Sequence, residues 1–382
     1  MIDGIMFAGY ASGIKAAGLD LGLAVFKEPM NCLSLYTRNK IKAAHIIHDK
    51  TIEANPVRAL LVNSGCANAC TGKDGISDLK VIAGELSNII GVNDNEILFA
   101  STGVIGKRLP TNKLIGALPG LCKNLKGNGI ESFAQSIMTT DTYPKIVSET
   151  VKGKKTYSII GVAKGAGMIN PLFATMLSFV FTDYPVSPSK IRHTFAKAGK
   201  ETFERITVDG ECSTNDTVML FTKTSDEDMV GLIDFEEKLY YVMKELSLMI
   251  VRDGEGATRV IHITVMGAKK KEYAERIARR IAISPLTKTA FFGCDPNWGR
   301  IVSAAGDADV PLQPSKIEIT LQGRPLVKSS VEVPFDEQEM KRLMNKKEIE
   351  LIVDLHDGRA SFDIYTTDLT YDYIKINASY RS

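Results

Sequence analysis

The sequence predicts a layered α/β protein with mixed or antiparallel sheets. Helical and strand-like patterns alternate along all 382 residues, a length that exceeds one compact core. Strand candidates in the middle of the chain are mostly apolar, as strands covered on both faces are. Several candidates near the C-terminus instead alternate apolar and polar residues, which is typical of a half-solvated antiparallel sheet. We therefore expect two domains, or one large and elaborated domain.

Helices are predicted where apolar residues recur at helical spacing. In the first such segment Leu79, Ile82 and Leu86 share one face, and Gly91 suits the C-terminal cap. The second segment begins at Ser187–Pro188, a pair that suits the first turn of a helix. The predicted helices are Asp78–Ile90, a segment that starts at Ser187 and includes Ile191, Phe195 and Phe203, Asp234–Ile250, and Lys269–Ile281.

Short runs rich in β-branched and aromatic residues predict strands. In chain order they are Arg58–Val62, Glu96–Ala100, Tyr157–Ala163, Met176–Phe181, Val260–Met266, Lys316–Leu321, Ile349–Leu355 and Ser361–Tyr365. The helix and loop between about Lys269 and Gly306 precede the last three runs. We therefore expect a smaller C-terminal α/β domain from roughly residue 307 onward.

The composition is that of an ordinary globular protein, with 44% hydrophobic and 24% charged residues. A formal net charge of +2 gives no reason to expect a nucleic acid or an acidic membrane as partner. The N-terminal segment MIDGIMFAGY has no cluster of Lys or Arg and no long apolar core, so we expect no secretory signal. The longest apolar run, around Leu172–Phe181, is too short to span a bilayer. These observations predict a cytoplasmic protein.

The six cysteines are scattered along the chain without a CxxC pair, so no disulfide framework is predicted. Cys66 and Cys70 could form half of a metal site, but no matching Cys or His pair follows. Two small buried residues are the favoured interpretation. The five histidines show no ligand-like cluster either. We expect neither a metal nor a bound cofactor.

The most unusual stretch is KGAGMINPLFATMLSFVFTD, Lys164–Asp183, in which Thr175 opens a nearly unbroken apolar run. A hydroxyl at the mouth of a buried segment is explained if the chain is cut between Ala174 and Thr175. The threonine then acquires a free α-amino group. That amine, with an unperturbed pKa of about 7.7–8.0, can act as the base for the hydroxyl of the same residue.

Several other segments are too dense in Gly, Asn, Thr and Asp for a simple strand or helix. They are NSGCANACTG (Asn63–Gly72), ASTGVIG (Ala100–Gly106), MTTDT (Met138–Thr142), KGAGM (Lys164–Met168), TVDGECSTND (Thr207–Asp216), RDGEGATR (Arg252–Arg259) and FFGCDPNWGR (Phe291–Arg300). The GAG at Gly165–Gly167 lacks a third glycine, which weakens a dinucleotide-binding interpretation. No phosphate-loop motif and no GxSxG motif is present, which disfavours a nucleotide-binding protein and a Ser-His-Asp hydrolase.

Together these motifs resemble the glutamate N-acetyltransferase (ornithine acetyltransferase) family of arginine biosynthesis, from about Phe7 to Ser382. The most specific pieces are KGAGMINPLFATML, RITVDGECSTNDT, RDGEGAT, DPNWGR and LTYDYIKINASYRS. The resemblance implies an αββα sandwich of the self-cleaving N-terminal-nucleophile kind. It also implies self-cleavage into an α chain, Met1–Ala174, and a β chain, Thr175–Ser382. Both chains would share the main domain and assemble as α2β2.

The resemblance further implies a ping-pong acetyl transfer in arginine biosynthesis. Thr175 would take an acetyl group from N-acetylornithine, and glutamate would then take it from Thr175. The STG motif would stabilise the oxyanion with the Thr102 hydroxyl and the Gly103 backbone N–H, although those residues alone would indicate only a strand-to-turn junction. Some members also accept acetyl-CoA as donor. The residues do not decide between the two versions.

The family's substrates are amino acids, so the site must bind a carboxylate and amines. Lys164 suits the carboxylate and Glu255 suits the amine of ornithine, and glycines flank Glu255 on both sides. The TTD motif offers two adjacent threonines between which the sequence does not decide. The residues to which the resemblance assigns substrate contacts are Thr139 or Thr140, Lys164, Thr175, Glu255, Asn377 and Ser382.

The sequence departs from the family pattern at Leu172–Phe173, where a polar residue and methionine are expected, and at Cys66 and Cys294. A self-cleaving amidohydrolase or aminopeptidase remains the alternative function, with water as the acceptor. For TVDGECSTND and DPNWGR we favour a structural role, in which Asp and Asn side chains pin loops. Trp298, the single tryptophan, is expected either in the core or in a pocket wall.

Overall fold

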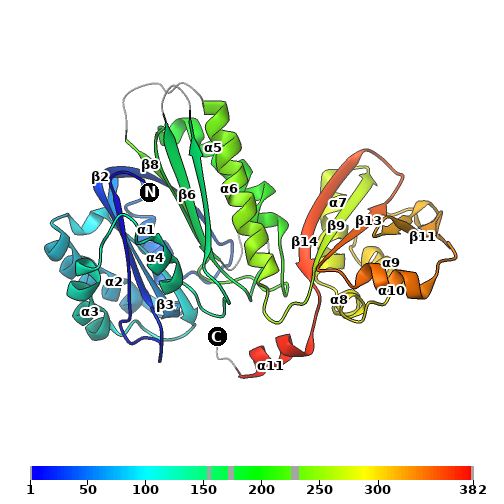
Figure 1. Cartoon of the computed structure of the whole chain (residues 1–382), viewed down its shortest axis with the longest axis horizontal. Coiled ribbons are helices and arrows are strands. Elements are labelled where there is room, and N and C mark those ends of the chain that lie inside the picture. Colours follow the sequence, from blue (N-terminus) through cyan, green and yellow to red (C-terminus); the bar gives the residue numbers. More distant parts are fainter. Residues whose placement is uncertain (1, 153–155, 171–175, 225–231, 380–382) are drawn as a thin grey trace. The chain divides into compact units, whose positions relative to one another are not determined.

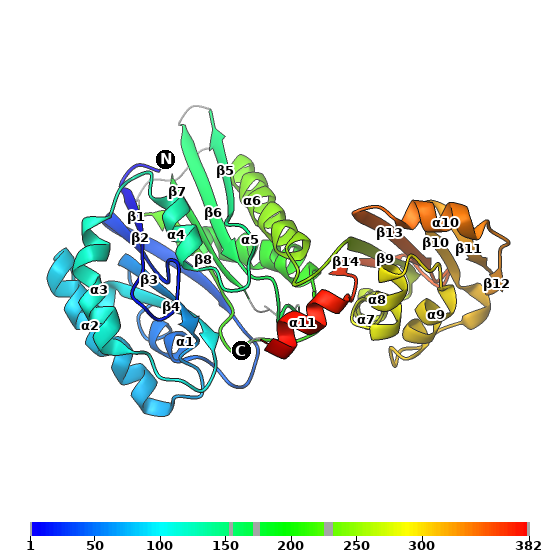
Figure 2. The same cartoon turned by 60° about the horizontal axis from the view of Figure 1, so that its bottom comes forward.

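The computed structural model describes residues 2–152, 156–170, 176–224 and 232–379 (Figures 1 and 2). These residues form two compact units. The first comprises the described chain up to Glu204 together with Glu211–Ile250, and the second comprises Arg205–Gly210 together with the described residues from Val251 to Ser379. Each unit has its own sheet and its own helices.

The first unit contains, in its described residues, a sheet of eight strands in the order β4-β3-β2-β8-β7-β6-β5, with β1 pairing to β2. The strands are β1 (Ile5–Tyr10), β2 (Leu21–Tyr36), β3 (Val57–Cys66), β4 (Ile97–Val104), β5 (Lys145–Val151), β6 (Tyr157–Lys164), β7 (Leu177–Pro185) and β8 (Thr217–Lys223). Strand β2 joins two halves of this sheet. Its first part, Leu21–Val25, pairs with β1 and β3, and its second part, Met30–Tyr36, pairs with β8.

The two halves of the sheet pack face to face through an aromatic core. Phe7 of β1 meets Phe181 of β7 with ring centroids 5.0 Å apart, and Phe26 of β2 lies 5.1 Å from Phe221 of β8. Phe133 of helix α4 (Ile130–Ser136) closes the same cluster. The hydrophobic effect therefore holds two sheet layers together, because each layer buries one apolar face against the other.

Helices cover the outer faces of both layers (Figures 1 and 2). Leu79, Ile82 and Leu86 of α2 pack with α3 on the layer of β1–β4. On the other layer, a Cβ at Gly161 of β6 would lie 2.6 Å from Leu246 of α6, so glycine lets that helix lie close. The helices are α1 (Ala44–Asp49), α2 (Gly72–Ile90), α3 (Thr111–Lys123), α5 (Pro188–Glu201) and α6 (Leu232–Arg252). The expected αββα sandwich is thus confirmed.

In the part that the structure describes, the second unit contains a six-stranded sheet in the order β12-β11-β10-β13-β9-β14. Its strands are β9 (Val260–Ala268), β10 (Glu318–Leu321), β11 (Arg324–Lys328), β12 (Val331–Glu332), β13 (Glu348–Asp354) and β14 (Ala360–Thr367). Its helices are α7 (Lys271–Ala282), α8 (Pro285–Phe292), α9 (Trp298–Gly306), α10 (Glu337–Met344) and α11 (Tyr371–Ser379). Ile277 and Ile281 of α7 pack on Ile263 and Ile364 of the sheet.

The predicted strands and helices are all present, with ends that differ by a few residues. Gly91 ends α2 in the left-handed conformation, as expected, with φ +71°. The expected domain boundary near residue 307 differs from the division of the chain seen here, since the second unit already includes β9. That strand pairs in parallel with β13 and antiparallel with β14. Its partners lie about a hundred residues away, so local pattern could not assign it to the C-terminal sheet.

Lys288 holds the segment Arg205–Gly210 within the second unit. Its fully buried ammonium donates to the Val208 carbonyl at 2.7 Å, to the hydroxyls of Thr366 and Thr367, and to the Thr367 carbonyl. Burial lowers the pKa of Lys288 from 10.5 to about 7, against the opposing charges of Asp209 and Asp368.

This shift makes the stability of the protein depend on pH. Between about pH 7 and pH 10 the unfolded chain binds more protons at Lys288 than the folded chain does, so the free energy of unfolding rises with pH. We expect this group to contribute a slope of at most about 1.4 kcal/mol per pH unit. Urea unfolding at pH 7 and pH 9 should show a smaller slope for Lys288→Met than for the wild type. Equal slopes would contradict the assignment.

Candidate active site

The STG motif lies where β3 and β4 end side by side. The two strands are parallel and pair Ser64 with Thr102 and Gly65 with Gly103. Gly103 has φ +125°, and a Cβ there would lie 2.4 Å from the carbonyl carbon of Gly65. Only glycine fits this close approach of two backbones. The positive φ of Gly103 and its close contact with Gly65 thus distinguish this motif from an ordinary strand-to-turn junction.

Lys164 and Thr102 meet at this end of the sandwich. Lys164 is the last residue of β6, and its Nζ donates to Thr102 Oγ1 at 3.1 Å. Their exposed fractions are 3% and 7%. The two residues come from different sheet layers and lie 62 positions apart in the sequence. The predicted STG motif, with Thr102 and Gly103, and the predicted residue Lys164 are thus brought together.

The TTD motif is attached to the same place. Thr139 and Thr140 lie in the loop between α4 and β5, and both are half-buried. The Thr139 N–H donates to Asp141 Oδ2 at 2.9 Å, and the Gly165 N–H donates to Asp141 Oδ1 at 2.6 Å. The loop with both threonines is therefore fixed to the turn that follows Lys164. Asp141 belongs to the predicted TTD motif, but no signal in the sequence indicates a role for it.

Ala174 and Thr175, the predicted cleavage site, lie outside the described residues. Met176, which follows them, donates its N–H to Asp216 Oδ1 at 3.0 Å and accepts from the Thr217 N–H at 3.1 Å. Asp216 is fully buried, and this burial raises the pKa of its carboxyl well above the usual value. Both backbone groups of Met176 are thus anchored by the start of β8.

The TVDGECSTND motif has the structural role that the sequence favoured. Asn215 donates from Nδ2 to the carbonyls of Ala67 and Ser101, at 2.6 and 2.7 Å. Ser101 directly precedes Thr102 in β4. Asn215 therefore links the NSGCANACTG loop to the strand that carries the STG motif. A single buried amide holds both segments in register.

In the second unit Glu255 and Asn377 are in contact. Asn377 lies on α11 and donates from Nδ2 to Glu255 Oε2 at 2.8 Å and to the Tyr373 carbonyl at 3.1 Å. The Thr370 hydroxyl donates to the Gly256 carbonyl at 2.7 Å, which fixes the loop of Glu255 to the start of α11. Ser382 lies outside the described residues.

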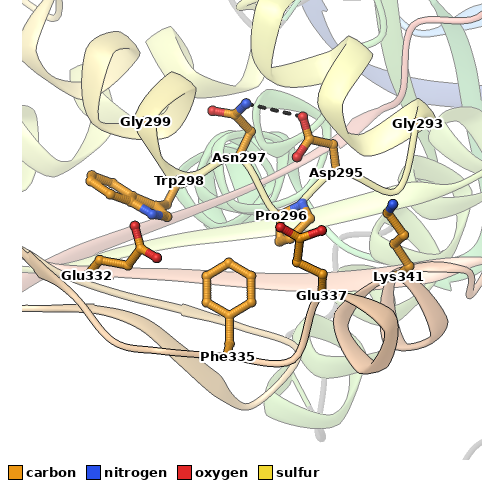
Figure 3. Close-up of a pocket in the computed structure, with 10 residues that line it drawn as sticks. All are labelled: Gly293, Asp295, Pro296, Asn297, Trp298, Gly299, Glu332, Phe335, Glu337 and Lys341. Atoms are coloured by element: carbon orange, nitrogen blue, oxygen red, sulfur yellow. Dashed lines mark hydrogen bonds between the residues drawn. The ribbon is translucent and has the colours of Figure 1, made fainter.

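Residues Asp295–Gly299 of the DPNWGR motif line a cavity of about 530 Å³ in the second unit (Figure 3). Asn297 caps α9 by accepting from the Arg300 N–H, and it donates to Asp295 at 3.1 Å. Trp298 packs against the apolar core and also lines the cavity, so both expectations for it hold. None of the described site residues that the sequence predicted is among the residues lining this cavity.

Within the described parts of the chain, no group of three or more His, Cys, Asp or Glu residues is placed to hold a metal ion. Cys66 is buried but Cys70 is exposed, so the expectation of two buried cysteines was wrong for Cys70. Cys70 has a positive φ of 58° in the loop before α2, and there its side chain points to solvent. No described helix is long and apolar enough to cross a membrane.

Comparison with known proteins identifies the family. The ArgJ family model matches residues 6–382, nearly the whole chain. The chain belongs to the ArgJ family. This confirms the resemblance inferred from the motifs, and with it an enzyme of arginine biosynthesis.

Two relatives from this family match all or nearly all of the chain. The arginine biosynthesis bifunctional protein ArgJ of Geobacter sulfurreducens is 41% identical and covers 100% of both chains. The protein of the same name from Streptococcus thermophilus is 39% identical over 98% of this chain and 96% of its own. A solved chain of the Bacillus halodurans ArgJ protein is 36% identical with a TM-score of 0.50, and it covers 54% of this chain and 100% of its own length.

Proposed function

We propose that the chain moves an acetyl group from N-acetylornithine to glutamate through an acetyl-Thr175 intermediate. Family membership over nearly the whole length supports this reaction. The observation that carries the proposal is the meeting of Thr102, Gly103 and Lys164 at one end of the sandwich. An oxyanion donor and a cation for a carboxylate are what acetyl transfer between amino acids requires there.

The proposed reaction begins after cleavage between Ala174 and Thr175. The new α-amine takes the proton of the Thr175 hydroxyl, whose oxygen attacks the acetyl carbonyl of N-acetylornithine. The Thr102 hydroxyl and the Gly103 N–H donate to the oxyanion that forms. Because Thr102 Oγ1 accepts from the Lys164 ammonium, its own hydrogen is left to donate. The α-ammonium then gives the proton from the Thr175 hydroxyl to the ornithine nitrogen, the C–N bond breaks and ornithine leaves. The amine of glutamate attacks the acetyl-threonine, and its proton passes through the α-amine to the departing Thr175 oxygen.

We assign substrate recognition to two charged groups. Lys164 binds the substrate carboxylate, beside Thr139 and Thr140. Glu255 binds the side-chain amine of ornithine, and Asn377 orients the Glu255 carboxylate through its hydrogen bond of 2.8 Å. A charge-assisted contact of this kind contributes about 1.5–3 kcal/mol.

The substitution Glu255→Gln tests this assignment. The glutamine side chain keeps a carbonyl oxygen for Asn377 but loses the charge, so we expect KM for N-acetylornithine to rise about 10- to 100-fold. KM for glutamate should change less, because glutamate has no side-chain amine. Glu348→Gln is the matched control, since Glu348 forms an exposed ion pair with Arg252. Equal effects on both substrates would contradict the role of Glu255.

Isotope transfer distinguishes the proposal from its alternatives. The purified enzyme is given N-acetylornithine with a ¹³C-labelled acetyl group, together with glutamate, and the products are followed by NMR. Labelled N-acetylglutamate supports transfer, whereas labelled acetate alone would indicate the self-cleaving amidohydrolase or aminopeptidase. A second arm with acetyl-CoA in place of N-acetylornithine decides whether that compound is also a donor.

We also propose, on the family resemblance alone, that the α and β chains assemble as α2β2 in the cytoplasm. Mass measurement of the native protein checks this assembly. A mass equal to one α and one β chain would contradict it.

A further inference from the structure

Asp141 and Lys145 form a buried ion pair beside the proposed site. Lys145 Nζ lies 2.6 Å from Asp141 Oδ1, and both side chains are completely buried. Lys145 opens β5 and pairs with Ala163 of β6, the residue that precedes Lys164. Taking two charges out of water is costly, and an apolar pair of similar volume often stabilises a fold equally well. Since stability alone does not explain a buried ion pair, its position next to the site indicates a role in the function of that site.

The Asp141 carboxylate connects two separate motifs. One oxygen accepts from the Gly165 N–H at 2.6 Å and from Lys145, and the other accepts from the Thr139 N–H at 2.9 Å. Gly165 directly follows Lys164 in the KGAG turn. A single carboxylate thus sets the distance between the TTD loop and the base of the Lys164 side chain.

The charge of Asp141 suits this task. Burial alone would raise the pKa of its carboxyl, but the charges of Lys164 and Lys145 and the Gly165 amide outweigh that effect and lower it. Asp141 is therefore ionised at neutral pH, where it accepts stronger hydrogen bonds than a neutral acid. The centroid of the Tyr143 ring lies 4.9 Å from Lys145 Nζ, and the Tyr143 hydroxyl donates to the Met249 carbonyl at 3.0 Å.

We propose that Asp141, kept in place by Lys145, is a positioning residue that sets Lys164 and the TTD threonines at the spacing needed to bind a substrate carboxylate. This inference rests on the proposed function and deepens it. Asp141 itself touches no reacting atom. It acts through the Thr139 and Gly165 amides, and its effect should therefore fall on substrate binding more than on the chemical step.

Asp141→Asn tests the proposal, because it keeps the shape but removes the charge and one acceptor. We expect KM for glutamate to rise roughly 10- to 100-fold while kcat changes much less, and the two fragments of self-cleavage still form. Glu149→Gln is the matched control, since Glu149 lies on the same strand β5 and pairs with the half-exposed Lys238 at 2.8 Å. It should leave KM unchanged. A wild-type KM in Asp141→Asn would overturn the proposal.

The double variant Asp141→Asn with Lys145→Met separates positioning from folding. It removes both buried charges, so it should recover thermal stability that the single variant loses. Under our proposal KM for glutamate stays raised, because the amide anchors remain changed. A purely structural pair predicts that KM returns to the wild-type value.

Crystal structures of the wild type and of both variants give a readout independent of activity. We expect the separation of Lys164 Nζ from Thr102 Oγ1, 3.1 Å in the wild type, to change in the variants together with the loop of Thr139. An unchanged geometry in both variants would overturn the inference. If instead the wild type transfers no acetyl group, the proposed function fails. The comparison of crystal structures then still tests whether Asp141 sets the position of Lys164.

Discussion

Replacing Thr175 with alanine should leave one uncut chain that transfers no acetyl group. Alanine has no hydroxyl, so it can neither attack the Ala174 carbonyl during self-cleavage nor accept the acetyl group afterwards. We expect the rate of transfer to fall by about 10⁴-fold or more, as it does when other enzymes lose their nucleophile. A denaturing gel and the isotope assay measure the two effects.

The control for this variant is Thr175→Ser, which keeps a hydroxyl and should still cleave, more slowly than the wild type. Circular dichroism and thermal unfolding establish that the alanine variant has folded. The wild type should run as two fragments that meet between Ala174 and Thr175. A wild-type protein that stays in one piece and is nonetheless active would refute the assignment of the nucleophile.

Replacing Gly103 with alanine should damage both stability and activity. The new Cβ would lie 2.4 Å from the Gly65 carbonyl carbon and 2.6 Å from the Cys66 nitrogen, and φ is +125°. Neither neighbour can yield easily, since both are backbone atoms of the paired strand β3. Overpacking and backbone strain together should cost about 2–5 kcal/mol. Moving β4 away also displaces the Gly103 N–H, so kcat should fall about 10²- to 10³-fold.

Gly106→Ala provides the comparison. Gly106 has φ +82°, but a Cβ there would meet nothing within 4 Å. It should therefore cost only the strain of a positive φ, about 1–2 kcal/mol, with transfer activity retained. Urea unfolding and the transfer assay are run on both variants. Similar losses for Gly103→Ala and Gly106→Ala would show that the close contact with β3 is unimportant.

The local sequence pattern predicted those elements in which apolar residues recur at a regular spacing along the element itself. The apolar face of α2 and its cap at Gly91 were readable because a helix is defined by neighbours three and four residues apart. Strand β2 was missed, because Glu28, Pro29 and Asn31 interrupt its apolar pattern at the point where it passes from one sheet layer to the other. A strand that changes partners within its own length has no single alternating pattern to detect.

In the candidate site, too, the sequence predicted some residues and missed one. The motifs singled out Thr102, Gly103, Lys164 and Glu255, since each lies in a segment too rich in glycine and polar residues to be ordinary structure. No sequence signal gave Asp141 a role, because an acid in a loop is normally a solvated group. Its burial and its bond to the Gly165 amide, 24 positions away, exist only after β5 and β6 have paired.

The sequence by itself determined the family and the residue expected to act as nucleophile, because these depend on the order of residues along the chain. It also marked the Ala174–Thr175 bond as the expected point of cleavage. Only the tertiary structure decided that Lys164 donates to the Thr102 hydroxyl and that a buried Asp141 holds the turn beside it. Such contacts depend on the packing of two sheet layers, which the hydrophobic effect drives and which leaves no local trace in the sequence.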